Sequence, residues 1–165
     1  MLPRYHFLLG LVFSVVLYFA LPNVGILNLA VFLVATVAID VDHYLYYVYR
    51  KKDYSLRNAI GWFDGSIKSL KKFDVKKRKE FYIGFCFLHG IEVLVLLLIL
   101  GYFVSNIFYF VCLGFAFHLI LDYIHGFRNK DRFDKFSIIY DYFKYGKLRF
   151  VEEIKGLASM NLKRR

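Results

Sequence analysis

Four long apolar segments constrain the fold of this chain more than any other feature. They cover roughly residues 7–21, 26–47, 81–104 and 107–127 of the 165-residue sequence. A bilayer core of about 30 Å is crossed by roughly 20 helical residues, so the first segment is short and the third is ample. Hydrophobic residues make up 59% of the chain, more than in a typical soluble domain. We therefore predict an all-α integral membrane protein, a bundle of four transmembrane helices.

The basic residues indicate how this bundle is oriented. Of the 23 Lys and Arg residues, one precedes the first segment, eleven lie between residues 50 and 79, and eleven lie between 128 and 165. The positive-inside rule therefore predicts a multi-pass protein of the cell (inner) membrane with both termini and the loop 48–80 in the cytoplasm. The net charge of +10 indicates attraction to anionic headgroups. It does not indicate nucleic-acid binding, because the basic residues bracket the spans instead of forming one soluble basic face.

Two basic segments outside the spans are amphipathic. Between residues 55 and 72 apolar residues recur at spacings of three and four, with Lys and Arg among them, which predicts a helix on the membrane surface. The tail 128–165 interleaves aromatic and basic residues in a similar way. We therefore expect a four-helix transmembrane domain over residues 1–127, including the loop 48–80, and a basic cytoplasmic tail over residues 128–165.

Ionisable residues within the spans mark the expected functional site, because a charge at the bilayer centre costs about 2.5 to 3.5 kcal/mol. Three pairs at helical spacings of three or four share a face: Asp40 with His43, His89 with Glu92, and His118 with Asp122. At 1.5 Å per residue these pairs lie roughly 13 to 18 Å from the expected cytoplasmic boundary, so they can converge. In an ideal helix Asp42 points away from Asp40, so both reach one site only if the helix end is distorted. His6 is only two residues from Arg4, so it can join only if the first helix begins lower in the membrane or the site opens as a cavity.

Zinc, manganese and iron are bound by histidine and carboxylate side chains of the kind gathered here from several helices. We expect zinc, with manganese or iron as alternatives. The expected metal ligands are Asp40, His89, His118 and Asp122, with His43 and His6 as further candidates. Glu92 or Asp42 is the expected general base, which would take a proton from water at the metal. Hydrogen bonds between helices, or a polar helix end at the interface, would explain each pair without a metal. The cysteines, Cys86 and Cys112, form no CxxC pair, and we expect buried apolar positions for both.

The order of these motifs resembles the membrane-bound metal-dependent hydrolase family, which includes LexA-regulated inner-membrane proteins and archaeal relatives. The matching elements are His6, "DVDH" at 40–43, "LHGIE" at 88–92 and "HLILD" at 118–122. Ile39 stands where the family pattern has proline, and the His-Arg-Gly element expected before the third span is absent. The resemblance implies metal-dependent hydrolysis and no particular substrate. We expect a metal site that faces the cytoplasm and hydrolyses an ester or phosphoester. A substrate reached at this depth is expected to be amphipathic, such as a lipid.

Two other classes remain open at this point. A metal or proton transporter would also bury carboxylates and histidines, but it should carry them into the outer half, where residues 12–33 and 93–111 have no charge. The second class is a structural or partner-binding membrane protein with a metal site. Such a protein would not require the ionisable residues to lie at the same depth in the membrane.

Overall fold

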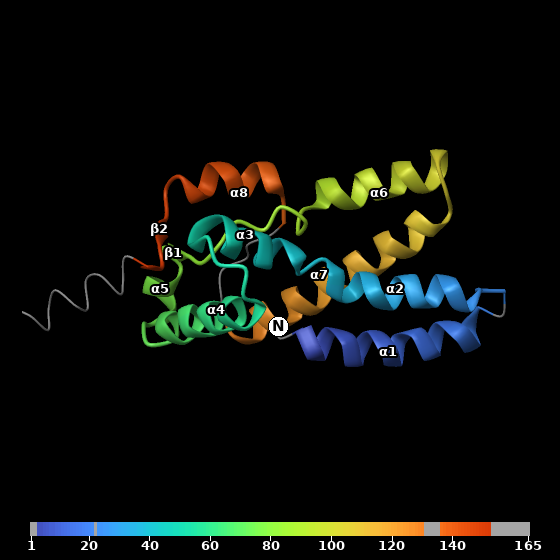
Figure 1. Ribbon diagram of the computed structural model, residues 1–165, viewed down its shortest axis with the longest axis horizontal. Coiled ribbons are helices and arrows are strands. Elements are labelled where there is room, and N and C mark those ends of the chain that lie inside the picture. Colours follow the sequence, from blue (N-terminus) through green and yellow to red (C-terminus); the bar gives the residue numbers. More distant parts are fainter. Residues whose placement is uncertain (1–2, 22, 131–135, 153–165) are drawn as a thin grey trace, which may run out of the picture.

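The computed structural model describes residues 3–21, 23–130 and 136–152, of which 73% are helical and 3% lie in strands. The elements in chain order are α1 (Pro3–Ala20), α2 (Ile26–Ala38), α3 (Val41–Lys51), α4 (Leu56–Leu70), α5 (Val75–Arg78), β1 (Phe81–Tyr82), α6 (Ile91–Phe103), α7 (Ile107–Arg128), α8 (Ile138–Tyr145) and β2 (Arg149–Phe150). The apolar helices α1, α2, α6 and α7 occupy one half of the molecule, and α4, α5, α8 and the strands occupy the other (Figure 1).

Three helical segments are long and apolar enough to cross a membrane, which agrees with the predicted membrane location. They are α1, the nearly continuous pair α2 and α3 (Ile26–Lys51), and α7. Apolar side chains cover the outside of α1, where Val12 is 62% and Phe19 is 76% exposed, as lipid contact requires. The fourth predicted span is not confirmed, because α6 has only 13 residues and is about 20 Å long at 1.5 Å per residue.

The prediction of one helix over residues 81–104 is wrong, because residues 81–90 are not helical and α6 begins at Ile91. Gly90 is the N-cap of α6 and has an extended backbone, with φ −107° and ψ 152°. Residues 81–82 form β1, which pairs in parallel with β2 in the register Phe81 to Arg149 and Tyr82 to Phe150. His89 therefore lies in a turn at the entrance to α6, and the expected helical pairing of His89 with Glu92 does not occur.

The predicted helix over residues 26–47 is interrupted at the start of the "DVDH" motif. Ile39 and Asp40 lie between α2 and α3, and the amide of Asp40 donates to the carbonyl of Val37. The amide of His43 in turn donates to the carbonyl of Asp40, which is again a bond between residues three apart. This tighter turn changes the helical phase locally, so residues on opposite faces of an ideal helix can point to one site.

Close packing of α2 against α1 and α7 forms the centre of the bundle, and α6 packs against α7. Gly114 of α7 allows this approach, since a Cβ there would lie 2.6 Å from the Cβ of Ala35 and 2.7 Å from the carbonyl oxygen of Phe32. The side chains of Phe32 and Ile39 are fully buried. The ends of α1, α2 and α7 are thereby fixed relative to one another.

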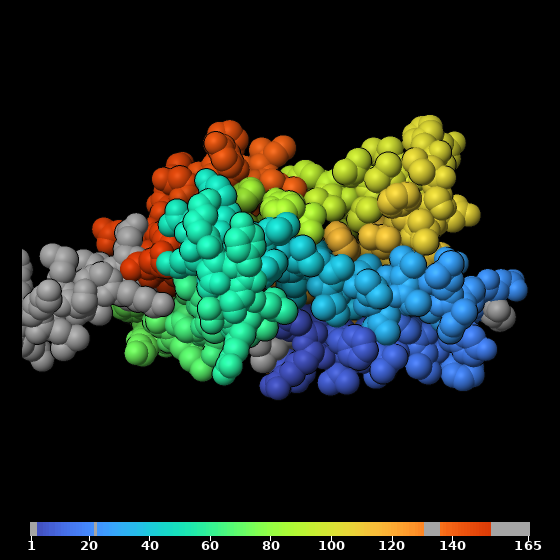
Figure 2. Space-filling view, in the orientation of Figure 1, coloured from blue at the N-terminus to red at the C-terminus, as the bar shows by residue number. Residues whose placement is uncertain are grey.

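The amphipathic helix expected at 55–72 is present as α4. Ser55 caps its N-terminus by accepting a hydrogen bond from the amide of Asn58. Trp62 donates to Glu152, which also pairs with Lys51. Burial alone would raise the pKa of Glu152, but these two contacts and the positive charges of Lys51 and Arg50 together hold the pKa below its usual value. Figure 2 shows α1 and α2 at one end of this face of the molecule and the region of α3 and α4 beside them.

Candidate metal centre

Three fully buried histidine rings meet where α1, α2, α6 and α7 come together. His6 is the fourth residue of α1, His89 lies in the turn before α6, and His118 lies in the middle of α7. The rings of His6 and His118 are stacked, with centroids 3.7 Å apart, and the ring of His89 stands nearly perpendicular to His118 at 5.2 Å. Among the described residues no hydrogen bond reaches the Nε2 atoms of these rings. Buried polar atoms are rarely left in this state, so the arrangement suits a ligand.

Two carboxylates lie between the three Nε2 atoms. Asp122 places one oxygen 3.3 Å from His6 Nε2 and the other 3.6 Å from His118 Nε2. Asp40 Oδ1 lies 3.6 Å from the Nε2 atoms of both His118 and His89. Nitrogen and oxygen ligands at roughly 2.0 to 2.2 Å from a tetrahedral zinc ion would be about 3.3 to 3.6 Å apart. The observed spacings match this separation and exceed that of a good hydrogen bond.

The five side chains form two overlapping groups that could hold a metal ion. One group contains His6, His118 and Asp122, and the other contains Asp40, His89 and His118, with the ligand atoms of each group within 4.8 Å of one another. His118 belongs to both groups. A neutral imidazole offers a metal one nitrogen lone pair, so His118 can bind one ion and the two groups are alternative or merged positions for it.

The remaining ring nitrogens fix the orientation of two of these histidines. His118 Nδ1 lies 2.8 Å from the carbonyl oxygen of Thr36, and His89 Nδ1 lies 2.9 Å from Asp42 Oδ2. A carbonyl oxygen only accepts, so His118 carries its proton on Nδ1, and its neutral ring has a lone pair on Nε2. Hydrogen bonds of this kind commonly hold a histidine in the form that binds a metal.

Asp42 lies behind this cluster instead of facing the Nε2 atoms. Its carboxylate is fully buried and accepts hydrogen bonds from the backbone amide of Leu88, at 2.9 Å, and from His89. Its other oxygen lies 2.8 Å from His43 Nδ1. The structure thus brings Asp42 into the site, together with Asp40, through the break between α2 and α3. In this position it orients histidines and does not itself reach the point where the three rings meet.

Glu92 is engaged elsewhere. Its carboxylate accepts hydrogen bonds from Ser137 Oγ and, at 3.0 Å, from the backbone amide of Ile138 at the start of α8. None of the described contacts of Glu92 joins the histidine cluster. The structure therefore places this expected base at the N-terminus of a surface helix, where a carboxylate is favourable.

Sequence reasoning missed two residues at the site. Thr36 stands four residues before Asp40 and contributes only its backbone carbonyl to His118, which no side-chain pattern can reveal. Cys86 was expected as an ordinary buried position, but its sulfur lies 3.4 Å from His43 Nε2. The sequence feature that could have placed Cys86 at the site is its CxxH spacing with the expected ligand His89.

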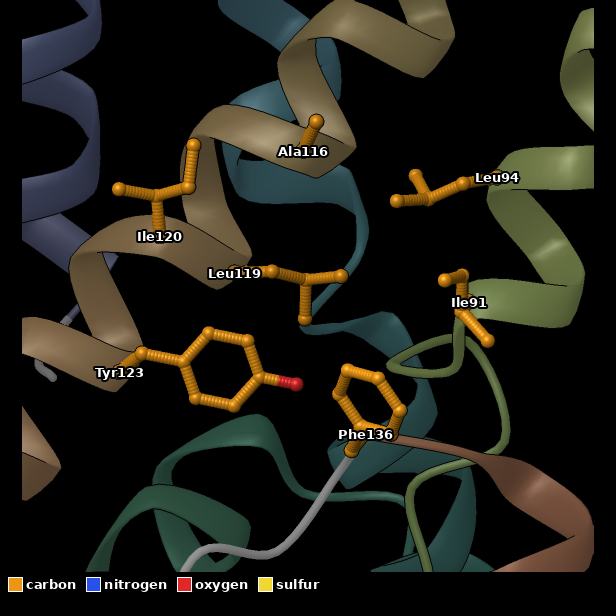
Figure 3. Close-up of a pocket in the computed structure, with 7 residues that line it drawn as sticks. All are labelled: Ile91, Leu94, Ala116, Leu119, Ile120, Tyr123 and Phe136. Atoms are coloured by element: carbon orange, nitrogen blue, oxygen red, sulfur yellow. The ribbon is translucent and has the colours of Figure 1, made fainter.

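An apolar pocket of about 220 Å³ adjoins α7 on the side of α6. Its wall consists of Ile91, Leu94, Ala116, Leu119, Ile120, Tyr123 and Phe136 (Figure 3). Leu119 and Tyr123 directly follow His118 and Asp122 in α7, so neighbouring faces of one helix carry the pocket wall and the metal-type ligands. The Tyr123 hydroxyl points toward Phe136 in this view.

No protein-family model matches this chain, and no curated protein or solved structure matches it either. The family resemblance of the motifs therefore stays a prediction.

Proposed function

We propose that this protein is a membrane-embedded metal-dependent hydrolase that acts on an ester or phosphoester. The observation that carries the proposal is the convergence of three histidine Nε2 atoms and two carboxylates, from four segments of the chain, at the spacings of a metal's ligands. The resemblance of the same motifs to a hydrolase family supports the reaction class.

The inner ligand set of histidine and aspartate favours zinc, with manganese or iron as alternatives. Such a metal supplies an electrophile that polarises a phosphoryl or carbonyl oxygen and makes water more acidic. The chain's own residues prepare the site: Thr36 and Asp42 hold the rings of His118 and His89 in position. All three rings are fully buried, whereas the side chains of Asp122 and Asp40 are 13% and 20% exposed, so the site is shielded at the histidines and accessible at the carboxylates.

The proposed substrate is a lipid or another amphipathic ester that approaches from the membrane. The apolar pocket between α6 and α7 supports this choice, because its walls offer room for a hydrocarbon chain next to the helix that carries His118 and Asp122. We propose that the site opens on the cytoplasmic face, where the basic loops would gather anionic headgroups.

Turnover by metal-loaded protein in mild detergent tests the proposal. The wild type, the double variant His118→Ala with Asp122→Ala, and the control His125→Ala would each be assayed against phospholipids and a broad panel of esters and phosphoesters. His125 lies on the same helix but is exposed, so its variant should keep full turnover while the double variant loses it. A metal-loaded wild type that is inactive on every panel would favour transport or a structural role instead.

A further inference from the structure

A second group of ligand-type side chains lies beside the first, on the other side of Asp42. His43 Nε2 lies 3.4 Å from Cys86 Sγ, and His43 Nδ1 lies 2.8 Å from Asp42 Oδ1. Cys86 is 8% exposed and the His43 side chain is 24% exposed, so the thiol is inside the protein and the imidazole borders solvent. Ligand-type atoms of Asp42, His43, Cys86 and His89 all lie within 4.8 Å of one another.

The distance from Cys86 Sγ to His43 Nε2 is that of two ligands on one metal, but the sulfur also lies 3.9 Å from Nδ1 and therefore over the face of the ring. Binding of a metal requires a side-chain rotation that brings the sulfur toward the Nε2 lone pair. A zinc ion with roughly 2.3 Å to a thiolate and 2.0 to 2.1 Å to an imidazole nitrogen separates the two ligand atoms by about 3.5 Å in a tetrahedral arrangement. The measured separation of Cys86 Sγ from His43 Nε2 is 3.4 Å. The contact of Asp42 with the opposite ring nitrogen orients His43 in the same way that it orients His89.

We propose that Cys86 and His43, supported by Asp42, form a second metal position that contains a thiolate. This position is chemically different from the first, whose ligands are only histidine and aspartate. A thiolate favours zinc, iron or copper(I) over magnesium, calcium and manganese, so the second position would select a softer ion. The two positions are linked through Asp42, which contacts both His43 and His89.

Cobalt substitution distinguishes the two positions, because a cobalt–thiolate bond gives a charge-transfer absorption that imidazole and carboxylate ligands do not give. Cobalt would be added to metal-depleted full-length protein in mild detergent, and both the absorption and the bound cobalt would be measured. The matched variants are Cys86→Ser and Cys112→Ser, since Cys112 is equally buried but lies among apolar residues of α6 and α7. His43→Ala is a second, independent test.

The wild type and Cys112→Ser should show the charge-transfer band, while Cys86→Ser and His43→Ala should lose it and bind less cobalt. The double variant His118→Ala with Asp122→Ala should keep the band and lose only cobalt of the first centre. Cobalt bound to wild type without a band, or a band that survives in Cys86→Ser, would overturn the second position and leave the proposed hydrolase centre standing. Protein that binds no cobalt at all would overturn both.

Discussion

His89 Nδ1 lies 2.9 Å from Asp42 Oδ2, so a histidine that belongs to no helix is held by a carboxylate from the first turn of α3. The same oxygen accepts the backbone amide of Leu88, one residue earlier. Asp42 therefore positions both the chain and the ring of His89, although the two segments are 47 residues apart.

Asp42→Asn should weaken metal binding by about 10- to 100-fold, as removal of a residue that orients a metal-binding histidine does. The amide is similar in size, but it carries no charge and keeps only one acceptor oxygen, so its NH₂ group replaces the acceptor either of His43 or of His89 and the Leu88 amide. Competition with a chelator of known affinity measures the effect. Asp64→Asn is the control, because Asp64 is exposed and pairs with Lys68 on α4. Equal affinities in the two variants would contradict the positioning role.

Removal of His118 and Asp122 together should release the metal of the first centre. Elemental analysis of wild-type protein, purified without chelator, should find about one equivalent if only the first centre is filled and about two if the position at Cys86 is filled as well. The double alanine variant should lose at least one equivalent, and His125→Ala should match the wild type. A folded wild-type protein that contains no metal would contradict the assignment.

Gly114→Ala should reduce the free energy of unfolding by about 1 to 3 kcal/mol, because the added methyl group overpacks the contact of α7 with α2. The nearest atoms belong partly to backbone, which cannot rotate away. Gly126→Ala is the matched control on the same helix, since a Cβ there meets nothing within 4 Å. Unfolding in mixed detergent micelles measures both variants, and equal stabilities would show that α2 and α7 are not so closely packed.

Glu92→Gln should preserve metal content and loosen α8. The carboxylate holds Ser137 and the amide of Ile138, and a neutral amide accepts these hydrogen bonds more weakly. Hydrogen exchange of the amides in 138–145 should therefore accelerate in the variant, with α4 as the internal reference. If the variant instead loses metal with unchanged exchange in α8, Glu92 belongs to the metal centre.

Both termini should be cytoplasmic, because the basic residues lie before the first span, between residues 50 and 79, and after the last. Reporter fusions after Arg165 and within the loop 71–79 should both report cytoplasm. An external signal from only one fusion would mean an odd number of crossings between the two sites. The result also decides whether the short helix α6 crosses the membrane together with α7.

Much of the site follows from sequence because α7 is a regular helix. The four-residue spacing of His118 and Asp122 places both on one face, as the structure has them. His6 could be named as a candidate, but not placed, since its depth depends on where α1 begins. The helix starts at Pro3, early enough to bring His6 beside His118.

The rest depends on local breaks that hydropathy does not report. Apolar residues continue from 81 to 104, yet the glycine at 90 and the pairing of β1 with β2 delay α6 until Ile91. This displacement removes His89 from the face of Glu92 and leaves Glu92 to bind α8. The proximity of Cys86 to His43 arises from the same non-helical segment, so no helical spacing could predict it.

The stacking of His6 on His118 has a consequence for biosynthesis. His6 leaves the ribosome more than one hundred residues before its stacking partner His118 and before Asp122. Helix α1 is therefore made before the residues that surround the imidazole of His6, and the site can be completed only after α7 has been inserted. Under the proposed function, metal loading would be a late step that follows completion of the bundle, and a truncated chain that ends before α7 would present no complete centre to a metal.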